Sequence, residues 1–229
     1  MGMLDLNPRV LYPEKSHRKI IKIPSRSKEL AELMGIIAGD GGINNPWQLV
    51  ITMNSDADAK YAVYVQELLQ NLFDIPVAVR KRPKINALVL VSSGRNLVDF
   101  LVAQGAIRGN KVKQQVDISG WITENSEYKQ MFVRGLIDTD GCLYIHKHGR
   151  KGGQRIYNNL GLCFTNRSPK LIEAVAVILQ ENKIVPHIQG QNLYLYSVDA
   201  VQKYLGIFGS SNPRITNKYK QWLQIRRDG

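Results

Sequence analysis

Two aspartates, Asp40 and Asp140, occupy matching surroundings one hundred residues apart. Residues 33–41 read Leu-Met-Gly-Ile-Ile-Ala-Gly-Asp-Gly, and residues 133–141 read Val-Arg-Gly-Leu-Ile-Asp-Thr-Asp-Gly. Two carboxylates brought close together repel each other unless a cation lies between them, and Mg²⁺ prefers oxygen ligands. A cation held in this way activates water and neutralises the charge of a phosphoryl group. The pair therefore predicts a Mg²⁺ site, provided that the chain brings the two aspartates together.

Each stretch also predicts a helix that packs closely on another helix. Small residues recur at i and i+4, Gly35 with Gly39 and Gly135 with Thr139, so each pair shares one helix face. Glycine inside a helix costs about 1 kcal/mol relative to alanine, and close packing of the two helices is a reason to keep it. The Asp-Gly step is expected to end each helix, with glycine in the left-handed conformation. One such helix is more often structural, but two copies with the same residues at the same offsets favour a functional pair.

Both stretches resemble the LAGLIDADG motif of homing endonucleases, in the form with two motifs on one chain. The resemblance covers most of residues 29–229. It implies an α+β fold of two αββαββα halves related by a pseudo-twofold axis, with the LAGLIDADG helices packed between them and antiparallel, saddle-shaped sheets lying on DNA. On this basis we expect a basic N-terminal arm at 1–28, a first half at 29–110, a linker at 111–125 and a second half at 126–229.

The resemblance assigns roles around the two aspartates. Asp40 and Asp140 stand at the acidic positions of the family and are expected to be catalytic metal ligands. The backbone carbonyls of the preceding residues, Gly39 and Thr139, are expected to help. Each half would then cut one of two antiparallel DNA strands.

Family members often place a lysine near the end of each half, close to the metal. Lys111, in Gly-Asn-Lys, and Lys218, in Thr-Asn-Lys, stand at comparable places. A nearby ammonium group would stabilise phosphoryl charge or help to activate water. Plain phosphate contact is an equally good interpretation, and Lys113 and Lys220 are competing candidates.

Three further polar positions belong to this prediction. A polar residue at the end of the second strand often orders water in the family, and Asn54 and Asn166 are the nearest matches. Met53, beside Asn54, departs from the usual polar choice, which makes the first site less complete. Asp138 has alanine as its counterpart in the first half, so we expect it to be a structural hydrogen-bond acceptor.

The composition favours a polyanionic partner. The chain has 229 residues, 44% hydrophobic content and a net charge of +12. The charge is +5 over residues 1–28, zero over 29–118 and +7 over 119–229. Nucleic acid is the first candidate for a partner, and a merely basic soluble protein is the alternative. No run of 18 apolar residues and no signal-peptide core is visible, and two cysteines make no disulfide framework, so we expect an intracellular protein of the cytoplasm, nucleoid or an organelle matrix.

Hydrophobic periodicity predicts the same order of elements twice. In the first half we expect a helix at 27–39, a hairpin over 43–53, a helix at 57–72, a hairpin of 77–82 with 87–91, and a helix at 97–102. In the second half the motif helix is followed by a strand at 142–147, a long basic turn, a strand at 160–165, a helix at 169–180, a hairpin of 186–189 with 193–197, and a helix at 198–208. Residues 109–128 look like a connecting segment.

The exposed faces and tips of these hairpins are the expected DNA surface. A two-stranded ribbon fits the major groove, where polar and basic side chains read base edges. A basic hairpin tip is more often only a solvated surface, so single contacts are weak predictions. The candidates are Asn44, Gln48, Arg80, Lys81, Arg82, Lys84, Tyr144, His146, His148, Arg150, Lys151, Arg155, Gln189, Gln191 and Asn192.

The predicted function is site-specific double-strand DNA cleavage by a monomer that uses Mg²⁺ or Mn²⁺, with Ca²⁺ as a non-catalytic substitute. The gene would be intron-encoded or free-standing, and intron RNA is a further candidate partner. The alternative is a catalytically silent nucleic-acid binder on the same fold, either a splicing maturase or a DNA-binding regulator. An intein is disfavoured by the residues at both ends. A zinc site at Cys142, His146, His148 and Cys163 is disfavoured because the spacing fits no standard zinc module.

Overall fold

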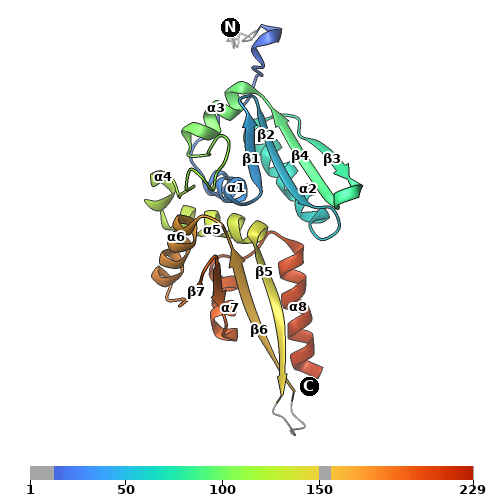
Figure 1. Cartoon of the computed structure of the whole chain (residues 1–229), viewed down its shortest axis with the longest axis vertical. Helices are drawn as coiled ribbons and strands as arrows, with labels where there is room; N and C mark the ends of the chain where they lie inside the picture. Colours follow the sequence, from blue (N-terminus) through green and yellow to red (C-terminus); the bar gives the residue numbers. More distant parts are fainter. Residues whose placement is uncertain (1–12, 150–155, 229) are drawn as a thin grey trace, which may run out of the picture.

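Two four-stranded antiparallel sheets make up the protein, and the computed structural model describes residues 13–149 and 156–228. The strand orders are β1-β2-β4-β3 and β5-β6-β8-β7, so the second sheet repeats the first. Figure 1 shows the two halves along the long axis, with helices α1 (Lys28–Gly39) and α5 (Ser126–Asp140) between them. The repeated order confirms the predicted duplication and the α+β fold.

The first half follows the predicted order of elements. Ser27 caps α1, since its Oγ accepts a hydrogen bond from the Leu30 amide at 3.2 Å. Ile43 and Ile51 are buried, as the strand alternation predicts. After α1 come β1 (Gly41–Asn45), β2 (Gln48–Asn54), α2 (Ala59–Phe73), β3 (Ala78–Arg82), the 3₁₀ turn η2 (Pro83–Ile85), β4 (Ala87–Ser93) and α3 (Arg95–Ala103).

The second half repeats this order and adds a final helix. A short helix, α4, precedes α5, and Trp121 and Ile122 in it are buried, so they anchor the connecting segment to the core. The elements are α4 (Gly120–Thr123), α5, β5 (Gly141–Gly149), β6 (Ile156–Thr165), α6 (Pro169–Glu181), β7 (His187–Gln189), β8 (Asn192–Leu195), α7 (Val198–Ile207) and α8 (Pro213–Asp228).

The β5–β6 hairpin is longer than predicted, because residues 147–149 pair as strand with residues 156–158. The expectation of a turn beginning at Lys147 was therefore wrong. Helix α8, which the sequence patterns did not indicate, supports this hairpin and lies beside it in Figure 1. Trp222 of α8 is fully buried, and its Nε1 donates to the Asn158 carbonyl at 2.9 Å. Backbone pairing needs no particular side chains, so the basic, glycine-rich sequence did not reveal these strand residues.

The two motif helices pack backbone against backbone. A Cβ atom added at Gly35 would lie 2.1 Å from the Phe132 carbonyl oxygen, and one added at Gly135 would lie 2.3 Å from the Glu32 carbonyl oxygen. Both distances are far below van der Waals contact, so only glycine fits at either position. The apolar residues around these contacts are buried on both helices: Leu33, Ile36, Ile37, Val133, Leu136 and Ile137.

The glycines after the two aspartates do not adopt the expected left-handed conformation. Gly141 is extended with φ −103°, and Gly41 is not among the glycines with positive φ. Each instead lies against the last turn of its own helix. A Cβ at Gly41 would lie 2.6 Å from Ile37 Cα, and one at Gly141 would lie 2.5 Å from the Ile137 carbonyl oxygen. The glycines allow each strand to leave its helix at a sharp angle.

The described part of the basic N-terminal segment packs on the first half without forming a strand. The Lys22 amide donates to the Phe73 carbonyl at 2.8 Å, and the Arg95 amide donates to the His17 carbonyl at 2.7 Å. The His17 ring stacks on Trp47 with centroids 4.6 Å apart. None of the described helices is both long and apolar enough to cross a membrane.

Candidate functional site at the ends of the paired helices

Asp40 and Asp140 end α1 and α5 side by side. A Cβ added at Gly39 would lie 2.0 Å from Thr139 Oγ1 and 3.4 Å from Asp140 Oδ2, which shows how closely the two helix ends approach. Burial, followed by the negative charges of Asp140 and Asp58, raises the pKa of Asp40 to about 7. The chain therefore holds two half-buried carboxylates next to each other at an energetic cost.

The two aspartates differ in their hydrogen bonding. Asp140 Oδ2 accepts from Asn166 Nδ2 at 2.7 Å, which opposes the rise in the pKa of Asp140 that burial causes. Within the described residues, no donor hydrogen-bonds the carboxylate of Asp40. A partly buried carboxylate without a donor fits a position that a cation occupies.

Lys111 reaches the end of α1 from the connecting segment. Its Nζ donates to the carbonyl oxygens of Ile37, Ala38 and Gly39 at 3.0, 3.0 and 2.6 Å. These carbonyls belong to the last turn of the helix, where the negative end of the helix dipole makes a cation favourable. Burial lowers the pKa of Lys111, and the charges of Asp140 and Asp40 oppose that change. The Gly39 carbonyl, predicted as a metal ligand, has this ammonium group as its partner here.

Arg214 has the corresponding place at the end of α5, where Lys218 was expected. Its Nη1 donates to the Gly141 carbonyl at 2.9 Å and its Nη2 to the Asp138 carbonyl at 3.2 Å, with a longer contact of 3.5 Å to the Thr139 carbonyl. Lys218 lies one turn further along α8 and donates to Gln221 Oε1 at 3.3 Å. Lys218 was chosen because Asn217-Lys218 resembles Asn110-Lys111. The cation that reaches the end of α5 is instead Arg214, which follows Asn212-Pro213. Among the described residues, Lys113 and the exposed Lys220 form no hydrogen bond or ion pair with either aspartate.

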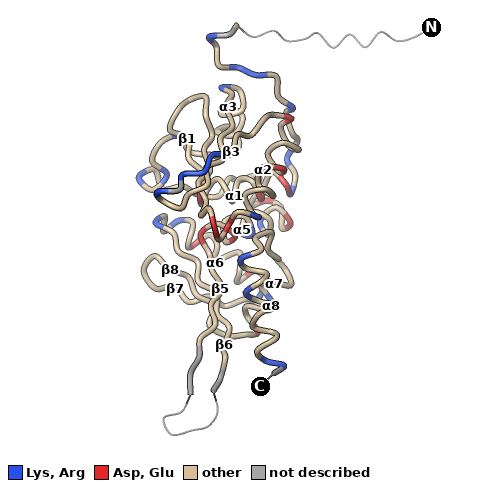
Figure 2. The backbone as a smooth tube through the Cα atoms, turned by 90° about the vertical axis from the view of Figure 1, so that its right-hand side faces the viewer, with Lys and Arg blue, Asp and Glu red and all other residues tan. Residues whose placement is uncertain are grey.

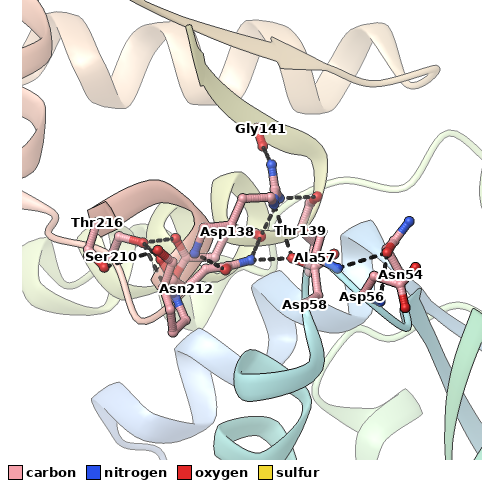
Figure 3. A network of polar contacts seen from close by, with 12 residues as sticks. Asn54, Asp56, Ala57, Asp58, Asp138, Thr139, Gly141, Ser210, Asn212 and Thr216 are labelled. Atoms are coloured by element: carbon pink, nitrogen blue, oxygen red, sulfur yellow. Dashed lines mark hydrogen bonds and ion pairs between the residues drawn. The ribbon is translucent and has the colours of Figure 1, made fainter. Parts of the chain in front are cut away.

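Asn54 and Asn166, the two predicted water-ordering residues, have different surroundings. Asn166 contacts Asp140 and also accepts from the Ser168 amide at 2.8 Å. Asn54 Oδ1 accepts from the amides of Asp56 and Ala57, each at 2.9 Å, and so fastens its own turn (Figure 3). Only the second half therefore brings this asparagine to its aspartate.

Asp138 is fully buried and acts as a hydrogen-bond acceptor for a segment near the C-terminus. Its Oδ1 accepts from Ser210 Oγ at 2.5 Å and its Oδ2 from the Ser211 amide at 2.7 Å, while burial raises its pKa to about 7. Asn212 Nδ2 donates to the Asp138 carbonyl at 2.9 Å and to Asp58 Oδ1 at 2.8 Å (Figure 3). This segment thus connects α5 to the first half.

Sequence reasoning missed Asp58, Asn212 and Arg214. A weak signal was present, because Asn110-Lys111 and Asn212-Pro213-Arg214 both place an asparagine shortly before a cation. A hollow of about 420 Å³ opens beside this site. Its polar lining includes Asp140, Asn166, Lys111 and Gln191, together with Arg167 and Thr165.

The exposed face of the first sheet is basic at its outer strand. Strand register places Arg80 opposite Val89 and Arg82 opposite Ala87, on the face that also carries Thr52. Lys81 alternates to the opposite face, so it does not share the expected DNA surface. Figure 2 shows the resulting run of basic residues along β3. The predicted candidates Asn44 and Lys84 are exposed at the hairpin ends, and Gln48 is half-buried in β2.

The exposed face of the second sheet is aromatic and polar. By register it carries Cys142, Tyr144, His146, Cys163 and Tyr194. The predicted candidates Gln189 and Asn192 pair at the β7–β8 end, and Asn192 Oδ1 accepts from Thr165 Oγ1 at 2.6 Å. Arg150, Lys151 and Arg155 lie outside the described residues, as does the side chain of His148.

Cys142 and Cys163 are free thiols on directly opposite positions of β5 and β6. Among the described residues, no group of three or more His, Cys, Asp or Glu side chains is placed to hold a metal ion. The two motif aspartates are therefore the acidic pair from which a metal site has to be argued.

Comparison with known proteins agrees with this geometry. Residues 127–221 match the family model of a LAGLIDADG-like domain, while a search of curated proteins gives no match. The fold of the whole chain is similar to meganuclease I-SmaMI bound to uncleaveable DNA, with a TM-score of 0.58, 12% sequence identity, and coverage of 88% of this chain and 89% of that chain. The chain has the two-motif LAGLIDADG fold.

Two other solved structures are also similar to most of this chain. I-DmoI in complex with DNA and Ca has a TM-score of 0.56 and 19% identity, covering 85% of this chain and 96% of that chain. Full-length DUF199/WhiA from Thermatoga maritima has a TM-score of 0.53 and 15% identity, covering 89% of this chain and 63% of that chain. At these identities the likeness concerns the LAGLIDADG fold, so function has to be argued from the site.

Proposed function

We propose that this LAGLIDADG protein is a site-specific endonuclease that cuts both strands of DNA with the help of divalent metal ions, Mg²⁺ being the expected ion. The observation that carries the proposal is the adjacent pair Asp40 and Asp140 at the ends of the packed helices. The structural relatives support it, because they include I-SmaMI bound to cleaved DNA and I-DmoI with DNA and Mn. A net charge of +12 supports a polyanionic substrate.

The residues present fit a divalent cation. Mg²⁺ is commonly held by one or two carboxylates together with water and substrate phosphate oxygens. Asp40 and Asp140 supply two carboxylates, and burial together with the negative charge of Asp140 raises the pKa of Asp40, a change that a bound cation would oppose. When bound, the ion would activate water and neutralise charge on the phosphodiester.

The remaining residues of the site have separate tasks in this proposal. Asn166 orients the Asp140 carboxylate through its hydrogen bond of 2.7 Å. Lys111 and Arg214 place positive charge beside the aspartates, where it would attract and stabilise a phosphate group. Of these two cations, only Lys111 has an ammonium group that can titrate, and burial lowers its pKa while the charges of Asp140 and Asp40 oppose that change.

The direct test uses a randomised duplex library incubated with the full chain and Mg²⁺, followed by sequencing of the cut ends. We expect paired breaks in both strands at one recurring sequence, and no breaks with a chelator. Asp40→Asn and Asp140→Asn should bind the selected duplex and fail to cut both strands. Unchanged cutting by both variants, or random cutting by the wild-type protein, contradicts the proposal.

One observation favours a second candidate, a nucleic-acid binder without catalysis. The Gly39 carbonyl accepts from Lys111, and the helix ends already have cations of the chain as partners, so the site is partly neutralised without metal. Selection of tightly bound duplexes separates the two candidates. A sequence-specific binder that leaves its selected duplex intact in Mg²⁺ and in Mn²⁺ would be of this second kind.

A further inference from the structure

Aromatic rings gather on the exposed face of the second sheet, where the first sheet carries arginines. Tyr194 of β8 stacks on Tyr196 with centroids 5.1 Å apart and an interplanar angle of 9°. His187 of β7 lies against Tyr196 with centroids 5.4 Å apart. Tyr196 is 50% exposed, so its ring remains open to a ligand.

Tyr144 adds a further ring beside these three. It lies over Gly161 of the neighbouring strand, because a Cβ at Gly161 would meet the Tyr144 ring at 2.3 Å. The absence of a side chain at Gly161 thus lets the tyrosine lie flat on the strand. Tyr144 and Tyr196 together line a hollow of about 290 Å³, with His146, Asn159, Leu160 and Gly161 as the other lining residues. We name this hollow the tyrosine pocket.

We propose that the tyrosine pocket binds a single base that is extruded from a DNA duplex. The inference rests on the proposed function as a DNA endonuclease. A paired base shows a protein only its edge in the groove, whereas an extruded base exposes its ring face, which stacks well on aromatic side chains. The amide of Asn159 supplies a donor and an acceptor for the edge of such a base.

The position of the pocket suits a base on the bound strand. Tyr144 lies four residues beyond Asp140 on β5, which corresponds to about 13 Å along a strand. One DNA strand rises about 3.4 Å per nucleotide, so the pocket faces a base roughly four nucleotides from the aspartates. The first sheet offers Arg80 and Arg82 at its exposed face instead, which are suited to phosphates or base edges. The two halves therefore contact their half-sites by different chemistry.

The experiment measures equilibrium binding of the full chain to matched DNA duplexes, one fully paired and one with a single extrahelical 2-aminopurine. Binding is measured without added metal so that cleavage cannot interfere. We expect the bulged duplex to bind more tightly, and the 2-aminopurine fluorescence to be quenched as the base stacks on tyrosine. Tyr196→Ala should remove the preference, with a loss of roughly tenfold in affinity for the bulged duplex.

Two controls separate stacking from general damage. Tyr196→Phe keeps the ring and should keep the preference. Ile188→Ala changes a side chain of equal exposure on the opposite face of the sheet and should leave both affinities unchanged. At the neighbouring ring, Tyr144→Phe keeps the aromatic side chain that covers Gly161 and should also keep the preference.

The outcomes are distinct. The proposal is wrong if the paired and bulged duplexes bind equally, or if Tyr196→Ala still prefers the bulged duplex. A bulge in RNA that binds while the same bulge in DNA does not also overturns the proposal for DNA. Failure of the pocket leaves the endonuclease proposal standing if the selected duplex is still cut, and failure of cutting leaves the pocket standing if the bulge preference is present.

Discussion

Asp58 of the first half accepts a hydrogen bond from Arg214 of the second half, with Oδ1 and Nε 3.0 Å apart. A second hydrogen bond joins the second half to the segment beside the first: Ser168 Oγ donates to the Val116 carbonyl at 2.9 Å. Val116 follows Lys111 in the segment that covers the end of α1. The first half therefore holds the segment that places Arg214 at the end of α5, and the second half holds the segment that places Lys111 at the end of α1.

Removing the Asp58–Arg214 contact should loosen the end of α5. We expect Arg214→Ala to lower the free energy of unfolding by about 1.5 to 3 kcal/mol, because charged hydrogen bonds to Asp58 and to helix carbonyls are lost. Lys218→Ala, one turn along the same helix, should change it by less than about 0.5 kcal/mol. Urea denaturation of both variants measures the difference, and equal stabilities would contradict the assigned role of Arg214.

The helix contact gives a second prediction. Gly135→Ala should destabilise the fold by about 1 to 3 kcal/mol or more, because the new Cβ would lie 2.3 Å from the Glu32 carbonyl oxygen. Gly206 in α7 has nothing within 4 Å of an added Cβ, so Gly206→Ala should be neutral or stabilising by up to about 1 kcal/mol. Thermal melting compares the two alanines, and a stable Gly135→Ala would argue against the close helix contact.

The raised pKa of Asp40 predicts how stability depends on pH. In the folded protein Asp40 has a pKa of about 7, so it keeps its proton until the pH approaches 7. In the unfolded chain the same carboxyl group loses its proton near pH 3.8. The unfolded state thus binds fewer protons in this window, and the free energy of unfolding falls as the pH rises from about 4 to about 7, by at most about 1.4 kcal/mol per unit from this group.

Asp40→Asn should reduce that slope and raise the melting temperature at pH 8. Added Mg²⁺ should stabilise the wild-type protein at pH 8 through binding to the folded state, and should have little effect on Asp40→Asn. Cleavage should increase as the pH rises through 7, because the deprotonated carboxylate binds the ion. If the stability of the wild-type protein and of Asp40→Asn depends on pH in the same way, the pKa of Asp40 is not raised by its surroundings.

Asn166 contacts its motif aspartate and Asn54 does not, which predicts that substitutions at the two positions affect cleavage of the two DNA strands differently. Asn166→Ala should leave the Asp140 carboxylate without its donor and cause nicked duplex to accumulate. Asn54→Ala should instead cost about 0.5 to 2 kcal/mol of stability, because Asn54 fastens the turn before α2. Gel separation of nicked and linear products measures the effect, and equal nicking by both variants would contradict the asymmetry.

The register of β3 predicts which basic residues contact DNA. Arg80→Gln combined with Arg82→Gln should weaken binding and reduce the dependence of log Kd on log salt concentration by about 2, if each arginine contacts one phosphate. Lys81→Gln, on the opposite face, is the matched control and should leave the slope unchanged. A larger effect at Lys81 than at the two arginines would place the DNA on the other face.

Much of the fold was predictable because its signals are local. The repeated helices, the hairpins and the order of elements follow from hydrophobic periodicity and from turns that lie close together in the chain. Helix α8 was not predicted because its sequence is mostly polar, and because the burial of Trp222 depends on the long β5–β6 hairpin that the helix covers. The extension of that hairpin was not predicted because its basic, glycine-rich residues resemble a turn.

The sequence by itself determined that two motif helices end in aspartate, that glycines allow them to pack closely, and that the chain suits a polyanion. Only the tertiary structure decided which side chains surround those aspartates. Lys111 and Arg214 reach the two helix ends, and Asn166 reaches Asp140 while Asn54 turns away. The reason is physical: the position of a loop side chain depends on contacts between segments far apart in the chain, and residue spacing does not encode those distances.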